Sequence, residues 1–231
     1  MLTICLAGVN IGIDNQYDLA PRLQGWLTEA APVFTVRVSP EELLREDDGS
    51  GKPPDYLEYI CVYRKLAERL PDYDAFVFHG AAIAMDGRAY LFTAPSGTGK
   101  TSHGQIWRYL WADRAYFLNG DKPILRRGPE GFLACGTPWR GKEGFGVNET
   151  LPIQGICLLH RGTENRIERA APEELIRFLT RQIYIPRDPD RAERLLQLLD
   201  ACCRTVPAWS MRCTLNLDAA RISYAAMRPR D

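Results

Sequence analysis

The chain has 231 residues, 45% hydrophobic and 25% charged, which is ordinary for a globular protein of one domain, with or without a small appendage. Its 29 basic and 29 acidic side chains balance, so no overall charge attracts it to nucleic acid or to an anionic membrane. No apolar run approaches the roughly 20 residues of a membrane span, the N-terminus lacks the basic region of a signal peptide, and no Cys-x-x-Cys pair occurs. We therefore expect a cytoplasmic protein with reduced, mostly buried thiols and no structural zinc.

The N-terminal part of the chain, up to residue 72, is predicted to form a small α/β unit. Apolar runs indicate strands at residues 2–9 and 34–38, and a short helix is expected within residues 19–30. The polar segment 46–54 is typical of an exposed loop, and apolar residues at helical spacing follow it over residues 56–70.

A β-hairpin is predicted to lead into a glycine-containing loop. Strands are expected at residues 75–79, 81–85 and 88–93, and Asp86-Gly87 favours a two-residue type I′ turn between the last two. The strand that enters the loop is then one arm of an antiparallel pair. Common nucleotide-binding folds have a parallel sheet before such a loop, so we expect a mixed, antiparallel-rich sheet here.

The loop at residues 94–101 is the most informative motif of the sequence. It reads Ala-Pro-Ser-Gly-Thr-Gly-Lys-Thr and precedes a helix expected over residues 101–111. Such a loop directs backbone N–H groups and the positive end of the helix at a phosphate chain. We expect it to bind ATP, with Lys100 at the β- and γ-phosphates and Thr101 at Mg²⁺; otherwise it is a plain glycine turn with a solvated lysine. The predicted nucleotide-binding residues are Ser96, Gly97, Thr98, Gly99, Lys100, Thr101 and Ser102.

The rest of the chain continues the alternation of strands and helices. Strands are expected at residues 115–119, 122–126, 153–160 and 207–213, and helices at residues 173–183, 190–203 and 218–227. Residues 73–231 form the predicted catalytic domain, either separate from residues 1–72 or continuous with them. The predicted fold class is α/β, close to α+β, with helices packed on a mixed sheet.

Three further places carry candidate chemistry. Asp121 follows a strand shortly after the loop helix, where a carboxylate would hold Mg²⁺, although Asn-Gly-Asp is also an ordinary turn sequence. The glycine-rich segment 136–148 is predicted not to pack as core. Its Arg140 and Lys142 would stabilise a transferring phosphoryl group or bind an anionic substrate, unless the segment is merely a mobile solvated loop. His79 ends a strand, where a lone histidine is more often structural than catalytic, and His103 and His160 are weaker candidates.

His79-Gly80, the hairpin, the glycine loop and Gly120-Asp121 together resemble the catalytic domain of HPr kinase/phosphorylase and, more distantly, ATP-dependent phosphoenolpyruvate carboxykinase. The resemblance covers residues 75 to about 150 and implies a phosphoenolpyruvate carboxykinase-like fold with a phosphate loop on a mixed sheet. It implies that Lys100 and Thr101 hold phosphates and Mg²⁺, that Asp121 is a further metal ligand, and that His79 lies near the phosphoryl group. It also places a charged catalytic loop at residues 140–146.

One departure from this family concerns the catalytic base. HPr kinases carry two adjacent aspartates after the strand, the first of which deprotonates the acceptor serine, whereas this chain has Gly120 there. The base then comes from elsewhere, with Glu143 and His79 as candidates, or none is needed, because phosphoryl transfer depends mainly on positioning and charge stabilisation.

The sequence therefore predicts an ATP- and Mg²⁺-dependent kinase. The acceptor is a hydroxyl of a small molecule, or of a serine in a peptide or protein. One alternative is an ATP-binding regulatory module without turnover, which Gly120 favours. A carboxykinase-like lyase is the weakest alternative, because no oxaloacetate-binding residues are evident. No nucleic-acid or membrane partner is expected, and the sequence is compatible with a homo-oligomer.

Overall fold

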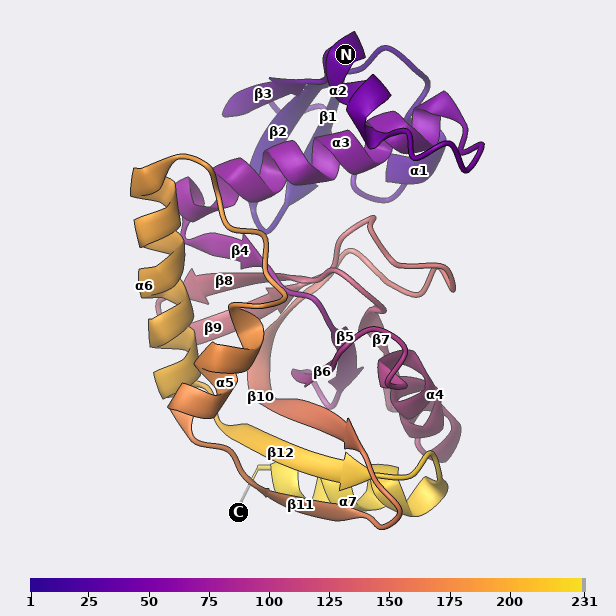
Figure 1. The fold of residues 1–231 in the computed structure, drawn as a ribbon, viewed down its shortest axis with the longest axis vertical. Coiled ribbons are helices and arrows are strands. Elements are labelled where there is room, and N and C mark those ends of the chain that lie inside the picture. The colour runs from indigo at the N-terminus through magenta and orange to yellow at the C-terminus, as the bar shows by residue number, and fades with distance from the viewer. Residues whose placement is uncertain (230–231) are drawn as a thin grey trace.

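The computed structural model describes residues 1–229, which form a three-stranded and a nine-stranded sheet with helices packed against both (Figure 1). The larger sheet is curled and contains both parallel and antiparallel pairs, so the fold is mixed α/β. Within this described range, none of the helices combines the length and apolar character that a bilayer span requires.

The three-stranded sheet lies at the N-terminal end and has the order β1-β2-β3. The elements of this part are β1 (Leu2–Leu6), β2 (Val9–Asp14), α1 (Ala20–Leu23), β3 (Phe34–Arg37), α2 (Pro40–Glu46), α3 (Pro54–Arg69) and the short 3₁₀ helix η1 (Leu70–Tyr73). The segment expected as one strand over residues 2–9 is a hairpin instead, because Ala7 and Gly8 adopt φ angles of 49° and 74° and reverse the chain. The helix expected within residues 19–30 ends at Leu23, since Gly25 takes a left-handed φ of 89° just beyond it.

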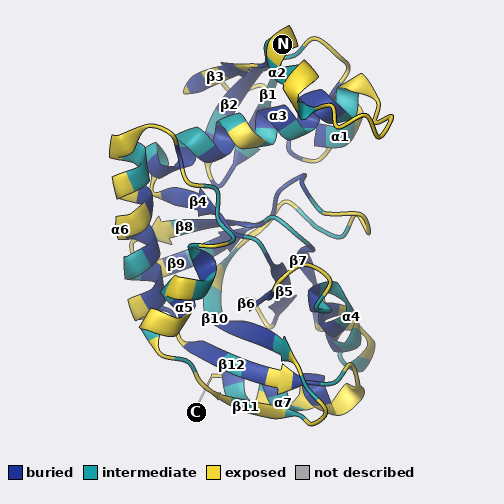
Figure 2. Ribbon diagram, viewed as in Figure 1, coloured by how far each residue is buried: buried dark blue, intermediate teal, exposed yellow. Residues whose placement is uncertain are grey.

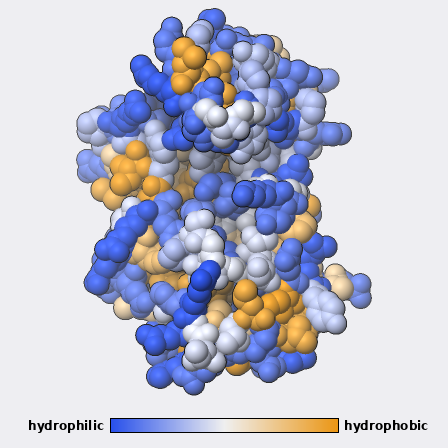
Figure 3. Space-filling view, turned by 45° about the vertical axis from the view of Figure 1, so that its right-hand side comes forward, coloured by the Kyte–Doolittle hydropathy of each residue, from blue (hydrophilic) through white to orange (hydrophobic). Residues whose placement is uncertain are grey.

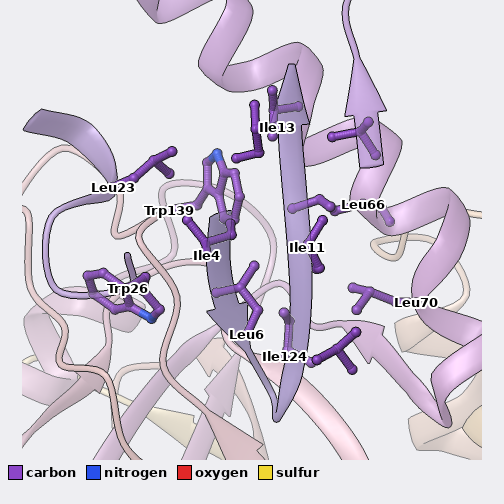
Figure 4. Close-up of a cluster of buried hydrophobic side chains, with 14 of the residues drawn as sticks. Ile4, Leu6, Ile11, Ile13, Leu23, Trp26, Leu66, Leu70, Ile124 and Trp139 are labelled. Atoms are coloured by element: carbon purple, nitrogen blue, oxygen red, sulfur yellow. The ribbon is translucent and has the colours of Figure 1, made fainter. Parts of the chain in front are cut away.

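The N-terminal core extends across the predicted boundary at residue 72. Figure 4 shows side chains of β1 and β2 packed with Leu66 and Leu70 and with two residues from later in the chain, Ile124 and Trp139. Ala75 and Val77 belong to the same cluster. The division into residues 1–72 and 73–231 remains a prediction, and the two parts share one buried cluster.

The larger sheet has the strand order β4-β8-β9-β10-β6-β5-β7, with β12 on β10 and β11 at the edge. Its strands are β4 (Ala75–Val77), β5 (Ala81–Met85), β6 (Arg88–Thr93), β7 (Ala115–Asn119), β8 (Ile124–Gly128), β9 (Gly131–Cys135), β10 (Thr150–Arg161), β11 (Arg166–Arg169) and β12 (Ala208–Cys213). The predicted hairpin is present: β5 and β6 are antiparallel, and Asp86 and Gly87 between them have φ angles of 52° and 73°. The two strands not expected from the sequence, β9 and β11, are short, and β11 is a polar edge strand without an apolar face.

Helices cover both faces of this sheet. They are α4 (Lys100–Leu110), α5 (Pro172–Leu179), α6 (Pro189–Thr205) and α7 (Leu217–Met227). Alternate residues of the central strands enter opposite cores: Leu91 packs with α5 and α6, whereas Tyr90 and Phe92 pack with α4 and α7. Figure 2 shows this burial along the central strands and the inward sides of the helices. The seven cysteines are free thiols, all but Cys5 buried.

The surface gives no sign of a large apolar contact area on the face drawn in Figure 3, where hydrophobic patches are small and separated by hydrophilic surface. Exposed large hydrophobic side chains such as Leu44, Tyr109 and Leu215 are scattered over different elements. Single exposed apolar residues are normal for globular proteins. The place that stands out is a cavity between α3 and the start of α4.

Candidate functional site

The glycine loop, residues 94–101, connects buried strand β6 to helix α4 as the sequence predicts. Gly97 and Gly99 adopt φ angles of 74° and 114°, which residues with a Cβ atom rarely adopt. No side chain caps the N-terminus of α4, so its first backbone N–H groups stay available to a ligand. The loop therefore offers a turn of free donors at the positive end of a helix, which is the geometry that binds anions.

Lys100 lies at the base of this loop and is only 9% exposed. Its Nζ donates to the carbonyl oxygen of Ala94 at 3.0 Å and approaches that of Pro95 at 3.5 Å. Burial lowers the pKa of Lys100, while Asp121 acts in the opposite direction. None of the carboxylates within residues 1–229 lies at hydrogen-bond distance from this buried ammonium, which suits a site that an anion can enter.

The outer side of the loop is held by two residues from late in the sequence. The guanidinium of Arg161, at the end of β10, donates to the carbonyl oxygen of Gly97 at 2.5 Å. Leu215 packs so closely that a Cβ added at Gly99 would lie 3.0 Å from its Cδ2 atom. The position of the glycine loop is thus fixed from outside as well as by β6 and α4.

Asp121 follows β7 in a turn that the Asn119 side chain builds. The Oδ1 atom of the fully buried Asn119 accepts from the backbone N–H groups of Asp121 at 2.8 Å and of Lys122 at 2.7 Å. Its Nδ2 atom donates to the carbonyl oxygen of Thr137 at 3.0 Å. The turn and the functional interpretation of Asp121 are therefore compatible, because the turn leaves the carboxylate free to face the cavity.

The carboxylate of Asp121 lies among cationic and titratable side chains. Its Oδ1 atom is 3.5 Å from Nε2 of His79 and 3.9 Å from Nζ of Lys122. Burial acts to raise the pKa of Asp121, but the contact with His79 and the charges of Lys122 and Lys100 outweigh it, so the pKa is lowered. Asp121 is therefore ionised at neutral pH.

The segment 136–148 differs from the expectation that it does not pack as core. Residues 136–139 are buried, and Trp139, 5% exposed, donates from its indole Nε1 to the carbonyl oxygen of Tyr59 at 3.0 Å. This segment is anchored because Trp139 fits the N-terminal core, whereas residues 141–144 are exposed. Its tip carries Lys142 and Glu143, and the Glu143 carboxylate lies beside Gly141, next to Asp121.

One cavity of about 1310 Å³ brings these groups together. Every side chain or glycine predicted for the site lines it except Thr98, including His79, Asp121, Arg140, Lys142 and Glu143. The weaker candidates lie elsewhere: His103 is buried against Ser223, with Nε2 at 3.0 Å from the hydroxyl, and His160 lines a separate polar pocket at the edge of the sheet. The site residues themselves stay a prediction, now with a shared location.

Sequence reasoning missed several residues that line the cavity. Lys122 is the clearest, and its position directly after Asp121 was the available signal. Burial lowers its pKa, and the Asp121 carboxylate acts against that effect. The tyrosines of α3 and Tyr184 also line the cavity. In the sequence, the tyrosines of α3 lie in a segment with apolar helical spacing and Tyr184 lies in a loop, so neither pattern indicated a site.

The residues present fit a phosphate-bound Mg²⁺ ion. Within residues 1–229, no group of three or more His, Cys, Asp or Glu side chains is placed to hold a metal ion alone. Mg²⁺ commonly binds through one or two protein oxygens together with waters and substrate phosphates. The Asp121 carboxylate and the Thr101 hydroxyl, both at the cavity, supply that number of oxygens.

Comparisons with known proteins give distant likenesses to solved structures. No protein-family model matches the chain, and no curated protein sequence matches it. Among solved structures, the chain is similar to the HPr(Ser) kinase/phosphatase from Coxiella burnetii, with 10% identity and a TM-score of 0.37. The match covers 66% of this chain and 99% of that chain. The chemistry of the cavity therefore has to be inferred from the residues that line it.

Proposed function

We propose that the protein is an ATP-dependent kinase that transfers the γ-phosphoryl group to a hydroxyl acceptor. The observation that carries this proposal is the convergence of the glycine loop, the buried Lys100 and the ionised Asp121 on one cavity. A helix N-terminus with free N–H groups binds the triphosphate, and Lys100 leaves its carbonyl partners to meet the phosphates.

In the proposed reaction, the acceptor oxygen forms a bond to the γ-phosphorus. The bond from that phosphorus to the β–γ bridging oxygen breaks, and ADP leaves with the electron pair. When bound by Thr101, Asp121 and the phosphates, Mg²⁺ neutralises negative charge on the phosphate oxygens. Lys122 and Lys142, which line the same cavity, add positive charge there.

The hydroxyl proton needs an acceptor other than residue 120. A Cβ atom added at Gly120 would lie 3.1 Å from the carbonyl oxygen of Arg140, so a side chain there would be crowded by backbone. We propose that His79 accepts this proton. Its Nε2 atom lies 3.5 Å from the Oδ1 atom of the Asp121 carboxylate. Glu143 at the exposed tip is the second candidate, and the variants His79→Asn and Glu143→Gln separate the two by which one lowers kcat.

The same absence of a side chain at residue 120 favours a second function, a nucleotide-binding module without turnover. The two functions differ in whether ADP appears. Purified protein with ATP and Mg²⁺ is incubated with a panel of alcohols and serine peptides, and ADP and phosphorylated products are followed by ³¹P NMR. A kinase forms ADP in step with a phosphorylated acceptor, whereas a module binds ATP and forms no ADP with any acceptor.

Lys100→Met provides the variant for this experiment. The kinase proposal expects ADP formation to stop in this variant, because the ammonium that contacts the phosphates is gone. Lys52→Met is the matched control, since Lys52 is an exposed loop lysine paired with Asp48 at 2.6 Å. ADP formation that survives in Lys100→Met would contradict the proposed role of the glycine loop.

A further inference from the structure

The cavity is larger than a nucleotide site needs. Its volume of about 1310 Å³ exceeds the roughly 300–1,000 Å³ of ordinary small-molecule pockets. The glycine loop, Lys100 and Thr101 line one side of it, and residues of α3 line the other. A second ligand therefore has room beside the nucleotide, and the α3 side is the place where it would lie.

The α3 side is an aromatic surface, which we call the tyrosine wall: Tyr56, Tyr59, Tyr63 and Trp139. The ring of Trp139 stacks on that of Tyr59 with centroids 5.2 Å apart, and lies 5.5 Å from that of Tyr63. Burial raises the pKa of both Tyr59 and Tyr63, so both phenols stay protonated at neutral pH. Tyr59 and Trp139 are buried and support the wall from behind, whereas the half-buried Tyr56 and Tyr63 offer aromatic surface and O–H groups to the cavity.

The charge beside this wall is uneven. Arg22 is paired with Asp55 at 2.7 Å, and Arg64 with Glu46 at 3.0 Å. Among the described residues, Arg140 has no carboxylate within 4.0 Å, and its guanidinium lies 5.5 Å from the ring centre of Trp26. One guanidinium beside the wall is therefore uncompensated, which suits a ligand with a single negative charge.

Arg140 lines the same cavity as the tyrosine wall, together with Asp121 and His79. The uncompensated guanidinium, the wall and the Asp121–His79 pair therefore all border the space that a second ligand would occupy.

We propose that the tyrosine wall and Arg140 form the acceptor site, and that the acceptor is an alcohol carrying one carboxylate and a flat apolar body. This inference rests on the proposed kinase function and names its substrate class. Arg140 binds the carboxylate, the apolar body packs on the half-buried Tyr56 and Tyr63, and the hydroxyl is left facing Asp121 and His79. The bonds formed and broken are those of the proposed phosphoryl transfer.

The test uses a matched pair of probes on the full chain. 3-Phenyllactate has a hydroxyl, a carboxylate and a ring, and 3-phenyllactamide is its neutral counterpart. Each is titrated by calorimetry into the free protein and into protein saturated with Mg²⁺ and a nonhydrolysable ATP analogue. We expect 3-phenyllactate to bind at least about tenfold more tightly than the amide, because only the carboxylate forms a charge-assisted contact with Arg140.

A variant sharpens the same titration. In Arg140→Gln the preference for the carboxylate over the amide is expected to disappear, while Arg88→Gln, which removes an exposed charge at the start of β6, keeps it. Equal affinity for the two probes in the unmodified protein, binding of neither, or a preference that persists in Arg140→Gln would overturn the proposal. The first two outcomes need no variant and so do not depend on its folding.

The two proposals fail in distinguishable ways. Binding of the ATP analogue without any preference for the carboxylate contradicts the acceptor site alone. Absence of nucleotide binding contradicts the kinase, and the titration of the free protein still decides whether the anion site exists. Phosphorylation of a serine peptide that has no carboxylate, at an equal rate in Arg140→Gln, would also overturn the acceptor class.

Discussion

The two sides of the cavity are built in different ways. The proposed nucleotide side is one continuous stretch, the glycine loop and the start of α4, and it presents mainly backbone N–H groups. The opposite side is assembled from side chains that lie far apart in the sequence, among them Tyr63 and Arg140. A backbone site is set by local sequence, whereas the side-chain site exists only once both sheets have packed together.

The largest expected effect comes from a change at Lys100, in the glycine loop. Lys100→Met is expected to weaken ATP binding by at least about a hundredfold, since an ammonium at the phosphates is lost. Burial lowers the pKa of Lys100 in the folded protein relative to the unfolded chain. At neutral pH, below both pKa values, the buried charge therefore reduces the unfolding free energy, and methionine removes this penalty. The melting temperature should stay equal or rise, and a clear fall together with unchanged ATP affinity would contradict this account.

Asp121 lies where the two sides meet, so its loss should affect turnover more than binding. Asp121→Asn is expected to lower kcat by roughly a hundredfold or more, through loss of negative charge at the metal and at His79. Affinity for ATP without Mg²⁺ should change little or increase. The measurement is kcat and ATP affinity at several Mg²⁺ concentrations, and an unchanged Mg²⁺ dependence would rule out the metal role.

A change at Tyr63 tests the side of the cavity that is assembled from side chains. Tyr63→Ala removes ring surface from the tyrosine wall and should raise the KM of the acceptor by about tenfold, with ATP affinity within twofold of the unmodified protein. Tyr63→Phe keeps the ring and should have a much smaller effect. Steady-state kinetics with both substrates varied measures the acceptor KM and the ATP affinity separately. A loss of ATP affinity that accompanies the rise in acceptor KM would show that the two sides of the cavity are not distinct.

Gly99 tests how far the nucleotide side depends on backbone geometry. Gly99→Ala places a Cβ at a φ of 114° and 3.0 Å from Leu215, so we expect a loss of about 1–3 kcal/mol in unfolding free energy and weaker ATP binding. Gly87→Ala is the matched control, at a φ of 73° with open space around it. It should lose about 1–2 kcal/mol from the left-handed φ alone and keep its ATP affinity. Denaturant unfolding and nucleotide titration give both values.

The last effect is confined to low pH and concerns His103, behind the glycine loop. Burial lowers its pKa to about 4, below the 6.5 of an exposed histidine, so the unfolded chain takes up the proton first. Stability attributable to this residue is therefore present above about pH 6.5 and is lost as the pH falls toward 4, by up to about 3 kcal/mol. His103→Gln should flatten the decline of unfolding free energy over this range, and an unchanged slope would contradict the assignment.

Local sequence predicted the strand, turn, loop and helix of the proposed nucleotide side for a physical reason. Asp86-Gly87 can adopt positive φ at both positions, and glycines at 97 and 99 do the same in the loop, so the strand, turn, loop and helix follow from a short window. Where positive φ falls on a residue that rarely adopts it, the signal fails. Ala7 has such a positive φ in the turn between β1 and β2, and alanine gives no sequence signal for it. The sequence therefore predicts one strand where the structure has a hairpin.

The acceptor side was not predictable in the same way. Tyr56 and Tyr63 fit the predicted apolar helical stripe and Tyr59 lies outside it, and nothing local shows that one side of this helix faces a cavity. The burial of Trp139 depends on the N-terminal core, which the loop sequence around it does not reveal. Lys122 could have been proposed as a site residue because it directly follows Asp121. Its closeness to the Asp121 carboxylate, however, depends on the turn held by Asn119.

Hydrogen–deuterium exchange with the nonhydrolysable ATP analogue and Mg²⁺ tests the division of the cavity most directly. The loop amides of residues 94–101 have few backbone hydrogen bonds and should exchange quickly in the free protein. We predict that the analogue slows exchange at these residues and leaves residues 56–63 unchanged. Slowed exchange at residues 56–63 with none at 94–101 would place the nucleotide on the tyrosine wall and contradict the account.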